Sequence, residues 1–314
     1  MIRKPISALG KKHGFLWGMR HYAPYYVLLL PMVAYFLIFC YGPMYGMIIA
    51  FKDYKLLNGI WGSEWVGLEH FSSLIKSFSF GKVLRNTLII SAMRIFFAFP
   101  IPIIFALFLN EIRSLPFKKT VQTISYLPHF ISWVILASIF KDMLSPSRGV
   151  VNILVRLFGG MPIDFLTEPS MFRWILLITG VWQSVGWSSI IYISAIASID
   201  VEQYEAAYIE GSNRLQNMWY ITLPSILPII SILFILSMGG VLNGNFDQVY
   251  NLVNPLTLGV GDILDTYVYR MGLQDMRYSF SAAVGLFKNV IGLICVLLTN
   301  AIVRKLSDQK NILW

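Results

Sequence analysis

The segment from Glu205 to Pro224, EAAYIEGSNRLQNMWYITLP, brings charged and aromatic side chains together between two apolar runs. It carries two carboxylates, a glycine and an arginine in a chain of 314 residues, of which only 13% are charged. Soluble domains carry about a quarter charged residues, so this composition is typical of a protein in lipid. A cluster of this kind, outside the apolar runs, is expected to make a contact with something other than lipid.

Sequence signatures of catalysis are absent. The chain has no G-x-x-x-x-G-K-[ST] motif for nucleotide phosphates, no H-E-x-x-H and no G-x-S-x-G. Cys40 and Cys295 both lie in apolar runs, which indicates neither a disulfide framework nor a metal cluster. We therefore expect a protein that is not an enzyme, with no metal site. The four histidines are scattered without ligand spacing: His13, His21, His70 and His129.

Six apolar stretches are long enough to cross a bilayer core, which takes about 20 residues per helix. The predicted fold class is an all-α polytopic membrane protein with six transmembrane helices and prolines that kink them, Pro128 among these. Outside the spans, Val150–Phe158 has apolar residues at helical spacing and is predicted to form a short amphipathic helix. The predicted spans are Tyr25–Ile49, Val83–Leu109, Val121–Met143, Arg173–Ala197, Ser225–Leu242 and Phe280–Val303.

Lysine and arginine gather on one side of these six spans, which predicts that both termini are cytoplasmic. We expect a basic N-terminal tail (1–24), a transmembrane domain (25–303) with a cytoplasmic loop at 198–224, and a short C-terminal tail (304–314). The net charge of +9 indicates anionic lipid headgroups rather than nucleic acid, because the basic residues flank apolar segments. They are Arg3, Lys4, Lys11, Lys12 and Arg20, then Arg113, Lys118 and Lys119, and finally Arg304, Lys305 and Lys310.

The cytoplasmic loop is predicted to contain two short helices. Good helix formers fill 204–210, Gly211 can end that helix in the left-handed conformation, and Ser212 can cap a second helix. In the second helix Leu215, Met218 and Trp219 share one face. A solvated loop is the alternative. Exposed aromatic side chains favour a docking surface instead.

The same loop resembles the cytoplasmic signature of permeases in binding-protein-dependent ABC importers. That signature is E-A-A, three residues, Gly, nine residues, Ile, one residue and Leu-Pro, and every spacing is met here. The resemblance implies the type I ABC importer permease fold with a coupling helix that seats in an ATPase subunit. It implies that Glu205 contacts the ATPase, that Ala206 and Ala207 allow close approach, and that Gly211 sets the turn. The predicted ATPase-coupling residues are Glu205, Ala206, Ala207, Gly211, Leu215, Met218 and Trp219.

The resemblance covers most of the chain and points to the carbohydrate branch. The segments NTLIIS, ALFLNEIRSLPFKKTVQTISYLPHFIS, NFDQVYNLVNP and DTYVYR look like permeases for complex oligosaccharides such as alginate or pectin fragments. The implied protein is one permease subunit in a bacterial cytoplasmic membrane, importing an oligosaccharide that is acidic if the likeness extends to substrate. The implied partners are a second homologous permease, an ATPase dimer that binds ATP and Mg, and an extracellular solute-binding protein.

Three polar clusters within the spans are predicted to line the substrate path, because polar groups at mid-membrane are costly unless they face a cavity. Resemblance to the more distant maltose-type permease points to positions within all three. Each has a duller alternative: His129 bonding a carbonyl freed by Pro128, tryptophans anchoring at the interface, and asparagines capping a helix. The predicted path residues are His129, Gln183, Ser184, Trp187, Asn243 and Asn245.

Arg94 lies midway along the second span, where a charged side chain indicates a functional site or an ion pair. It could meet a carboxylate of an acidic sugar or pair with the partner permease, and we favour pairing. Lys288 lies nearer a span end, where snorkelling is the simpler reading. Four residues are expected on the external surface that receives the binding protein, with packing of the last loop as the alternative: Asp265, Tyr267, Tyr269 and Arg270.

Two other classes of protein compete with this reading. An ion-coupled secondary transporter of a small polar solute would transport without an ATPase and would pair acidic residues deep in its spans. The spans hold few acids, which counts against it. A membrane-embedded enzyme would need a clustered nucleophile or metal site, and the sequence shows none.

Overall fold

The computed structural model describes residues 22–306, and within them the chain is helical apart from one short pair of strands. Most of the predicted N-terminal tail (1–24) and the end of the C-terminal tail (304–314) lie outside the described residues. Among the basic residues that set the predicted orientation, five thus fall outside at the N-terminal end and Lys310 at the C-terminal end.

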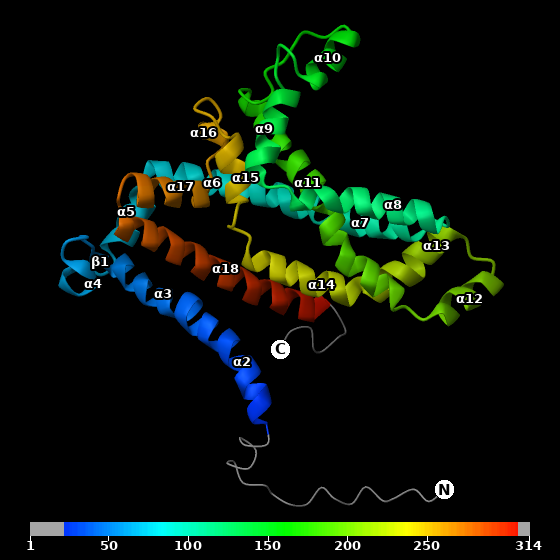
Figure 1. Ribbon diagram of the computed structural model, residues 1–314, viewed down its shortest axis with the longest axis horizontal. Helices are drawn as coiled ribbons and strands as arrows, with labels where there is room; N and C mark the ends of the chain where they lie inside the picture. Colours follow the sequence, from blue (N-terminus) through cyan, green and yellow to red (C-terminus); the bar gives the residue numbers. More distant parts are fainter. Residues whose placement is uncertain (1–21, 307–314) are drawn as a thin grey trace, which may run out of the picture.

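Five continuous helices within the described residues are long and apolar enough to cross a membrane, and a sixth candidate is broken. The prediction of an all-helical polytopic membrane protein is confirmed. Several of these long helices consist of shorter helical elements that follow one another along the chain (Figure 1). The five are Ala23–Phe51 (α2, η1, α3, η2), Phe78–Asn110 (α6, η3, α7), Pro169–Ala197 (α11), Arg214–Gly239 (α13, η5, α14) and Tyr278–Lys305 (within α18, Tyr278–Leu306).

The third predicted span, Val121–Met143, is broken. The chain forms α8 (Leu115–Tyr126), a 3₁₀ turn η4 (Leu127–Phe130) and α9 (Trp133–Met143), and the part that ends at Phe130 meets α9 at 104°. Pro128 lies inside the 3₁₀ turn and lacks the N–H that would continue the helical ladder. The bend itself lies just beyond this proline, at Ile131 and Ser132, where the backbone is extended. The predicted kink is therefore found close to Pro128 but not at it.

Prolines also widen the long helices without breaking them. A proline removes one backbone donor and clashes with the carbonyl of the preceding turn. A π turn relieves that clash by shifting the hydrogen bonds one residue along. The three cases are η1 (Phe36–Tyr41) and α3 (Gly42–Met44) at Pro43, η3 (Arg94–Ala98) before Pro100 in α7 (Pro100–Asn110), and η5 (Met218–Thr222) before Pro224 in α14 (Leu223–Gly239).

Helix α11 is the central element of the structure. It packs against α7, α8 and α14, and Figure 1 shows α7 and α8 running alongside it. A Cβ at Gly186 would lie 2.2 Å from the Ser125 carbonyl oxygen, so the backbones of α11 and α8 touch there. One buried cluster joins α7, α11 and the start of α14: Ile103, Ala106, Leu107, Tyr192, Ile196, Met218 and Ile226.

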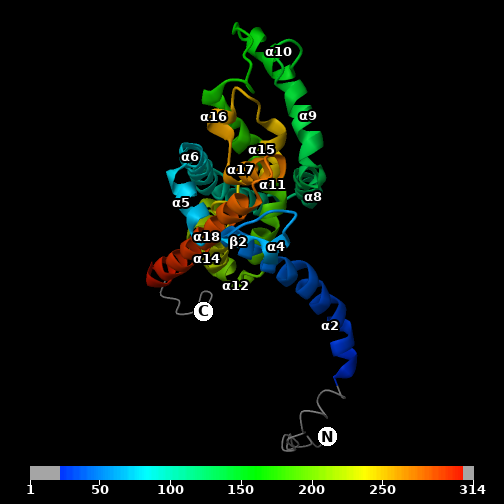
Figure 2. The same ribbon diagram turned by 90° about the vertical axis from the view of Figure 1, so that its left-hand side faces the viewer.

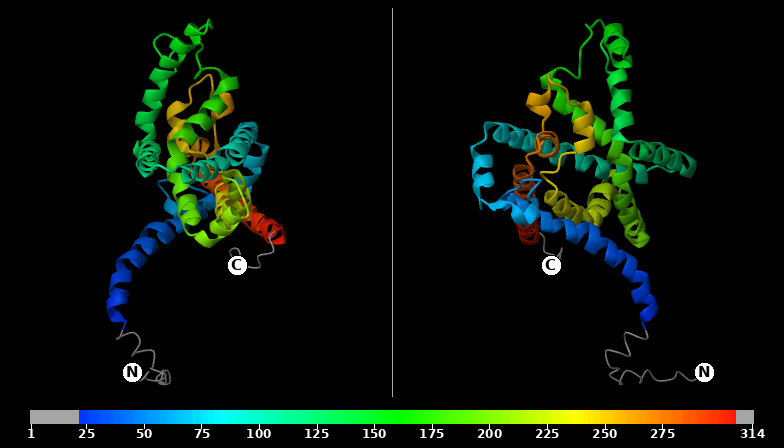
Figure 3. Two further views of the ribbon diagram at one scale, coloured as in Figure 1. Left: turned by 90° about the vertical axis from the view of Figure 1, so that its right-hand side faces the viewer. Right: turned by 60° about the vertical axis from the view of Figure 1, so that its left-hand side comes forward.

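The last helix, α18, crosses α14 equally closely. A Cβ at Gly292 would lie 2.5 Å from the Gly239 carbonyl oxygen, so this pair of helices also depends on a residue without a side chain. The first helix, α2 (Ala23–Tyr35), instead extends away from the body in every view, with no buried residue (Figures 2 and 3). Its continuation η2 (Tyr45–Phe51) joins it to the body by packing on α18.

Short elements fill the segments between the spans. The predicted amphipathic helix at Val150–Phe158 is confirmed as α10 (Val150–Leu157). Asn152 anchors it with hydrogen bonds to both the nitrogen and the oxygen of Ile163. The other short elements are β1 (Lys52–Asp53) pairing antiparallel with β2 (Glu64–Trp65), α4 (Gly59–Gly62), α5 (Glu69–Lys76), α15 (Phe246–Leu252), α16 (Leu258–Gly261), α17 (Leu264–Tyr269) and η6 (Arg270–Gln274).

The contact at Gly186 generates a prediction about stability. Replacing Gly186 with alanine should lower the free energy of unfolding by about 1–3 kcal/mol, because the new methyl group would overlap the Ser125 carbonyl and force the helices apart. Thermal unfolding of the purified protein in detergent measures this. Gly285→Ala on α18 is the matched control, since nothing lies within 4 Å of its added Cβ. Equal unfolding temperatures for wild type and Gly186→Ala would contradict the close crossing.

Candidate functional site

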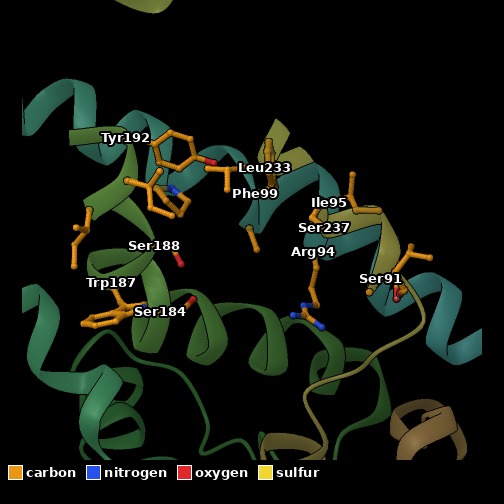
Figure 4. A pocket seen from close by; sticks show the side chains of 16 residues that line it. Ser91, Arg94, Ile95, Phe99, Ser184, Trp187, Ser188, Tyr192, Leu233 and Ser237 are labelled. Atoms are coloured by element: carbon orange, nitrogen blue, oxygen red, sulfur yellow. The ribbon is translucent and has the colours of Figure 1, made fainter. Parts of the chain in front are cut away.

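A cavity of about 580 Å³ lies between α6, α7, α11 and α14, bounded by 16 residues (Figure 4). Its wall is largely apolar, and its polar groups are a few hydroxyls, one indole and one guanidinium. This composition is typical of a ligand site, in which a few polar groups orient a ligand within an apolar wall. The lining residues are Ser91, Arg94, Ile95, Ala98, Phe99, Pro102, Ser184, Trp187, Ser188, Ile190, Ile191, Tyr192, Leu233, Ser237, Gly240 and Val241.

Two predicted path residues from the fourth span meet in this cavity with Arg94, the predicted charge-pairing residue of the second span. Ser184 and Trp187 both line it, one helical turn apart on α11, and Arg94 lines it from the start of η3. Figure 4 shows Arg94 and Trp187 on opposite sides of the hollow, with Ser184 and Ser188 between them. The cavity can thus offer a flat aromatic face, hydroxyl groups and one cation to the same ligand.

His129 supports the aromatic wall from behind. Its ring stacks on Trp187 with centroids 4.7 Å apart and an angle of 3° between the planes. Gln183 Nε2 donates to the His129 carbonyl oxygen at 3.4 Å, which brings the broken third span against α11. His129 Nδ1 is buried and has no hydrogen-bond partner among residues 22–306, so the alternative of a bond to a carbonyl freed by Pro128 finds no support there.

The two predicted asparagines lie at the end of the fifth span, and each has a structural partner. The backbone oxygen of Asn243 accepts a hydrogen bond of 2.9 Å from Arg94 Nη1. Asn245 begins α15, and its side-chain oxygen accepts from the backbone N–H of Gln248. Asn245 borders a separate small hollow beside Arg94 and is not in the main cavity. The structure therefore brings five predicted residues to one region but leaves Asn245 at its edge.

The loop after the fifth span is held by a charged network. Asp265 forms an ion pair with Lys288, and its other oxygen accepts from the backbone N–H of Gly244 at 2.8 Å. Lys288 therefore pairs inside the protein, and the prediction that it snorkels is wrong. Asp262 likewise pairs with Arg270.

The prediction that four residues here form an external receptor surface is not supported. Tyr267 is 3% exposed, and Asp265 and Arg270 are committed to the ion pairs above, so these side chains pack the last loop. Tyr269 is partly exposed and packs against Phe246 and Tyr250. A hydrogen bond between the two tyrosines raises the pKa of Tyr250.

Several cavity residues were missed by sequence reasoning. Ser91 with Arg94, and Ser184 with Trp187 and Ser188, recur at spacings of three and four residues, which is the signal of one helix face. That signal shows which residues share a face but not which faces of different helices meet. Ser237, Tyr192 and Phe99 gave no signal of their own, since isolated small or aromatic residues are common in spans.

The segment between the fourth and fifth spans, predicted to be cytoplasmic, contains the predicted turn. Helix α12 (Val201–Ile209) precedes Gly211, whose φ of +81° confirms the left-handed conformation. The second helix is α13 (Arg214–Asn217), and its cap is Asn213 rather than the predicted Ser212. The Asn213 side chain accepts from the Gln216 N–H at 2.9 Å, while Gln216 Oε1 accepts from the Asn213 N–H at 2.8 Å. A reciprocal box of this kind satisfies more donors than a lone serine can.

The predicted position of Met218 is also wrong. It was predicted to share an exposed face with Leu215 and Trp219, but it is 7% exposed, whereas each of the other two is 62% exposed. The reason is that α13 runs directly through η5 into α14 as one helix, Arg214–Gly239, so Met218 already belongs to the body of the protein. Contacts outside the protein at this segment are therefore available to Leu215 and Trp219, not to Met218.

A hollow of about 480 Å³ opens between α12 and α13. Ala206, Ala207 and Gly211 line it, while Glu205 is exposed beside it. The Tyr204 hydroxyl lies 2.9 Å from Thr222 Oγ1, which ties α12 to the base of the fifth span. Tyr220 lines the hollow as well. Five large apolar or aromatic side chains of this segment are exposed: Tyr208, Ile209, Leu215, Trp219 and Tyr220.

Within the described residues, no group of three or more histidine, cysteine, aspartate or glutamate side chains could hold a metal ion. The residues that line the cavity include hydroxyls but no carboxylate or imidazole that could act as their base. The geometry offers two contact surfaces, one between the spans and one at the α12–α13 loop.

Residues 98–308 match the family described as "Binding-protein-dependent transport system inner membrane component". The matched region includes both α11 and the cytoplasmic segment. Among curated proteins, Protein LplB of Bacillus subtilis (strain 168) is 43% identical over 97% of this chain and 96% of its own length. A second protein of that organism, the polygalacturonan/rhamnogalacturonan transport system permease protein YteP, is 45% identical over 90% of this chain and 88% of its own.

Solved structures agree with these sequence matches. A chain from the crystal structure of a bacterial alginate ABC transporter, in complex with an alginate pentasaccharide-bound periplasmic protein, superposes with a TM-score of 0.86. It is 39% identical and covers 94% of this chain and 99% of its own. A second structure, of a bacterial ABC transporter involved in import of the acidic polysaccharide alginate, gives a TM-score of 0.86 at 40% identity, covering 94% of this chain and 100% of its own.

Proposed function

The chain belongs to the family of inner membrane components of binding-protein-dependent transport systems, and we propose from this premise that it forms half of the path by which an ABC importer takes up an acidic oligosaccharide. It is a multi-pass permease subunit, not the catalytic one. The observation that carries the proposal is that the cytoplasmic segment joins two helices of the cavity wall.

That segment connects the cavity to the cytoplasm directly. Helix α11 lines the cavity through Ser184 and Trp187 and ends at Ala197, and three residues separate it from α12. After Gly211, α13 continues without a break into α14, which lines the cavity through Leu233 and Ser237. A force on the α12–α13 segment thus acts on both walls at once.

We assign this segment the docking of an ATPase subunit. Glu205 offers an exposed carboxylate, and the hollow lined by Ala206, Ala207 and Gly211 admits a close neighbour. Leu215 and Trp219 are exposed enough to be covered by it. An ATPase dimer supplies ATP binding with Mg, and its closure moves α12 and then the cavity helices.

A second, homologous permease completes the path on the open side of the cavity. An extracellular binding protein delivers the sugar, as the name of the family implies. We place both termini in the cytoplasm. If α8 and α9 together count as one span, there are six spans, and an even number of spans puts both ends of the chain on the same side of the membrane.

The substrate class comes from the relatives and from the cavity. YteP is described as a polygalacturonan/rhamnogalacturonan permease, and the structural match transports alginate, so both relatives handle acidic sugars. Trp187 supplies a stacking face and Ser184 and Ser188 supply hydroxyls, which are the groups that a sugar ring needs. His129 and Gln183 hold this wall in place.

Purification of the chain with the products of neighbouring genes tests the proposal. The copurified complex, placed in lipid nanodiscs with its binding protein, should hydrolyse ATP faster when acidic oligosaccharides such as oligogalacturonides or oligoalginates are added. A chain that copurifies with no ATPase, or an ATPase that no oligosaccharide stimulates, would contradict it.

Gly211 generates a prediction about coupling. Proline there should reduce sugar-stimulated ATP hydrolysis and uptake by at least about tenfold, because its ring fixes φ near −65° where the native value is +81°. Its substitution also removes the N–H that donates to the Tyr208 carbonyl at 3.0 Å. Gly211→Asn is the matched control, since asparagine enters the left-handed region readily. Both variants should insert into the membrane in normal amounts. Full uptake by Gly211→Pro would exclude this turn from coupling.

Trp187 generates a prediction about the path. Alanine at this position should slow uptake by about two- to tenfold, because a stacking face of the cavity is lost. Sugar binding to the soluble receptor should not change. Trp174→Ala is the matched control, since Trp174 lies on the same helix but packs against Phe97 outside the cavity. Uptake kinetics of Trp187→Ala that equal those of Trp174→Ala would remove Trp187 from the path.

A further inference from the structure

We propose that Arg94 binds a carboxylate of the oligosaccharide inside the cavity and so selects acidic sugars within the membrane. The proposal rests on the proposed function of the cavity as a sugar path. It adds a specificity-determining residue that lies in the permease, apart from any choice that the binding protein makes.

The first argument is the charge of the cavity. Of the 16 residues that line it, Arg94 is the one with a charged side chain. Among residues 22–306, no carboxylate oxygen lies within 4 Å of the Arg94 guanidinium, since none of the ion pairs there includes it. A cation inside a membrane protein is costly unless an anion meets it. The structure therefore holds a positive charge that has no anionic partner among residues 22–306, and a carboxylate that enters the cavity can supply one.

The second argument is that nearby carboxylates are already committed. Asp265 acts on Arg94 through space, but its carboxylate forms an ion pair with Lys288 and accepts from the Gly244 N–H. The Asp265 and Lys288 side chains are only 18% and 17% exposed, so this pair is shielded from the cavity. The charges of Arg94, Asp265 and Lys288 sum to one uncompensated positive charge.

The third argument is that Arg94 is held in position without being neutralised. Its Nη1 donates to the Asn243 carbonyl, which is 2.9 Å away and carries no charge. Asn243 is itself fixed, because the next residue, Gly244, donates to Asp265. A guanidinium has five N–H donors, so one bond to a carbonyl leaves donors for a second ligand. A neutral hydroxyl could accept hydrogen bonds from those donors, but the positive charge of Arg94 would stay uncompensated. A carboxylate can accept two of these hydrogen bonds as a bidentate pair and also neutralise the charge.

The opposite wall fits the rest of such a ligand. Trp187 offers its indole face and Ser184 and Ser188 offer hydroxyls across the cavity from Arg94 (Figure 4). A uronate residue has a ring for stacking, hydroxyls for hydrogen bonds and one carboxylate. The cavity presents matching groups of all three kinds, and its volume of about 580 Å³ is within the usual range for small-molecule sites.

The test uses the complete transporter, with both permeases, the ATPase and the receptor, in proteoliposomes. Uptake of trigalacturonate by the wild type first establishes that the path carries an acidic oligosaccharide. The receptor-free complex is then tested by equilibrium dialysis against trigalacturonate and its methyl ester. Arg94→Gln should raise the Kd for trigalacturonate by about tenfold to a hundredfold, which is the range for a lost charge-assisted hydrogen bond. The methyl ester lacks the carboxylate charge, so the wild type and Arg94→Gln should have the same Kd for it, or neither should bind it.

Two further variants sharpen the result. Arg94→Lys keeps the charge but loses the planar fork, so its Kd should fall between those of wild type and Arg94→Gln. Arg85→Gln removes an exposed arginine of the same helix that does not line the cavity, and its Kd should equal that of the wild type.

Three results would overturn the proposal, and they are distinct. If the wild type takes up no oligosaccharide, the proposed function fails and this inference fails with it. If uptake is normal but Arg94→Gln binds trigalacturonate as the wild type does, only the role of Arg94 fails. If Arg94→Gln separates the two permeases on gel filtration, Arg94 pairs with a carboxylate of the partner permease instead of the sugar.

Discussion

The contact between the backbones of α11 and α8 at Gly186 is the constraint on which the rest of the structure depends. A Cβ there would stand 2.2 Å from the Ser125 carbonyl, so the broken third span can reach α11 only because residue 186 has no side chain. This approach allows His129, four residues beyond Ser125, to stack on Trp187, one residue beyond Gly186. The same approach orients the face of α11 that carries Ser184 and Trp187 into the cavity. The polar wall of the path is thus a consequence of helix packing.

Chain continuity links this wall to the segment between the fourth and fifth spans. Two helices of the cavity, α11 and α14, are joined by α12, the Gly211 turn and α13. The hydrogen bond between Tyr204 and Thr222 ties α12 to the base of the fifth span. Proline-associated π turns lie in both the second and fifth spans, at η3 and η5, and they provide places where those helices can bend. In the proposed function, docking of an ATPase at this segment therefore changes the cavity without any nucleotide site in the chain.

Much of this was predictable from the sequence, because the strongest signals were local. Apolar length predicted six spans, five of which are continuous helices and one of which is broken. The pattern from Glu205 to Pro224 predicted the Gly211 turn, since a left-handed residue favours glycine. The errors arose where tertiary packing decides. Met218 has helical spacing with Trp219 but is buried, because α13 is continuous with the fifth span. Pro128 predicted a kink, but the bend of 104° lies just beyond it, at Ile131 and Ser132, where the backbone is extended. Lys288 and Asp265 lie 23 residues apart, and their ion pair has no sequence signature.

The most direct test of the account compares the two energy sources that could drive transport. Proteoliposomes that contain this chain with its partner permease and ATPase are loaded with ATP or with a non-hydrolysable analogue, and the uptake of labelled oligogalacturonide is followed with its receptor outside. The account predicts uptake that requires hydrolysable ATP and persists when proton and sodium gradients are collapsed with ionophores. Uptake by this chain that needs no ATPase and stops when an ion gradient is removed would contradict it and would identify a secondary transporter.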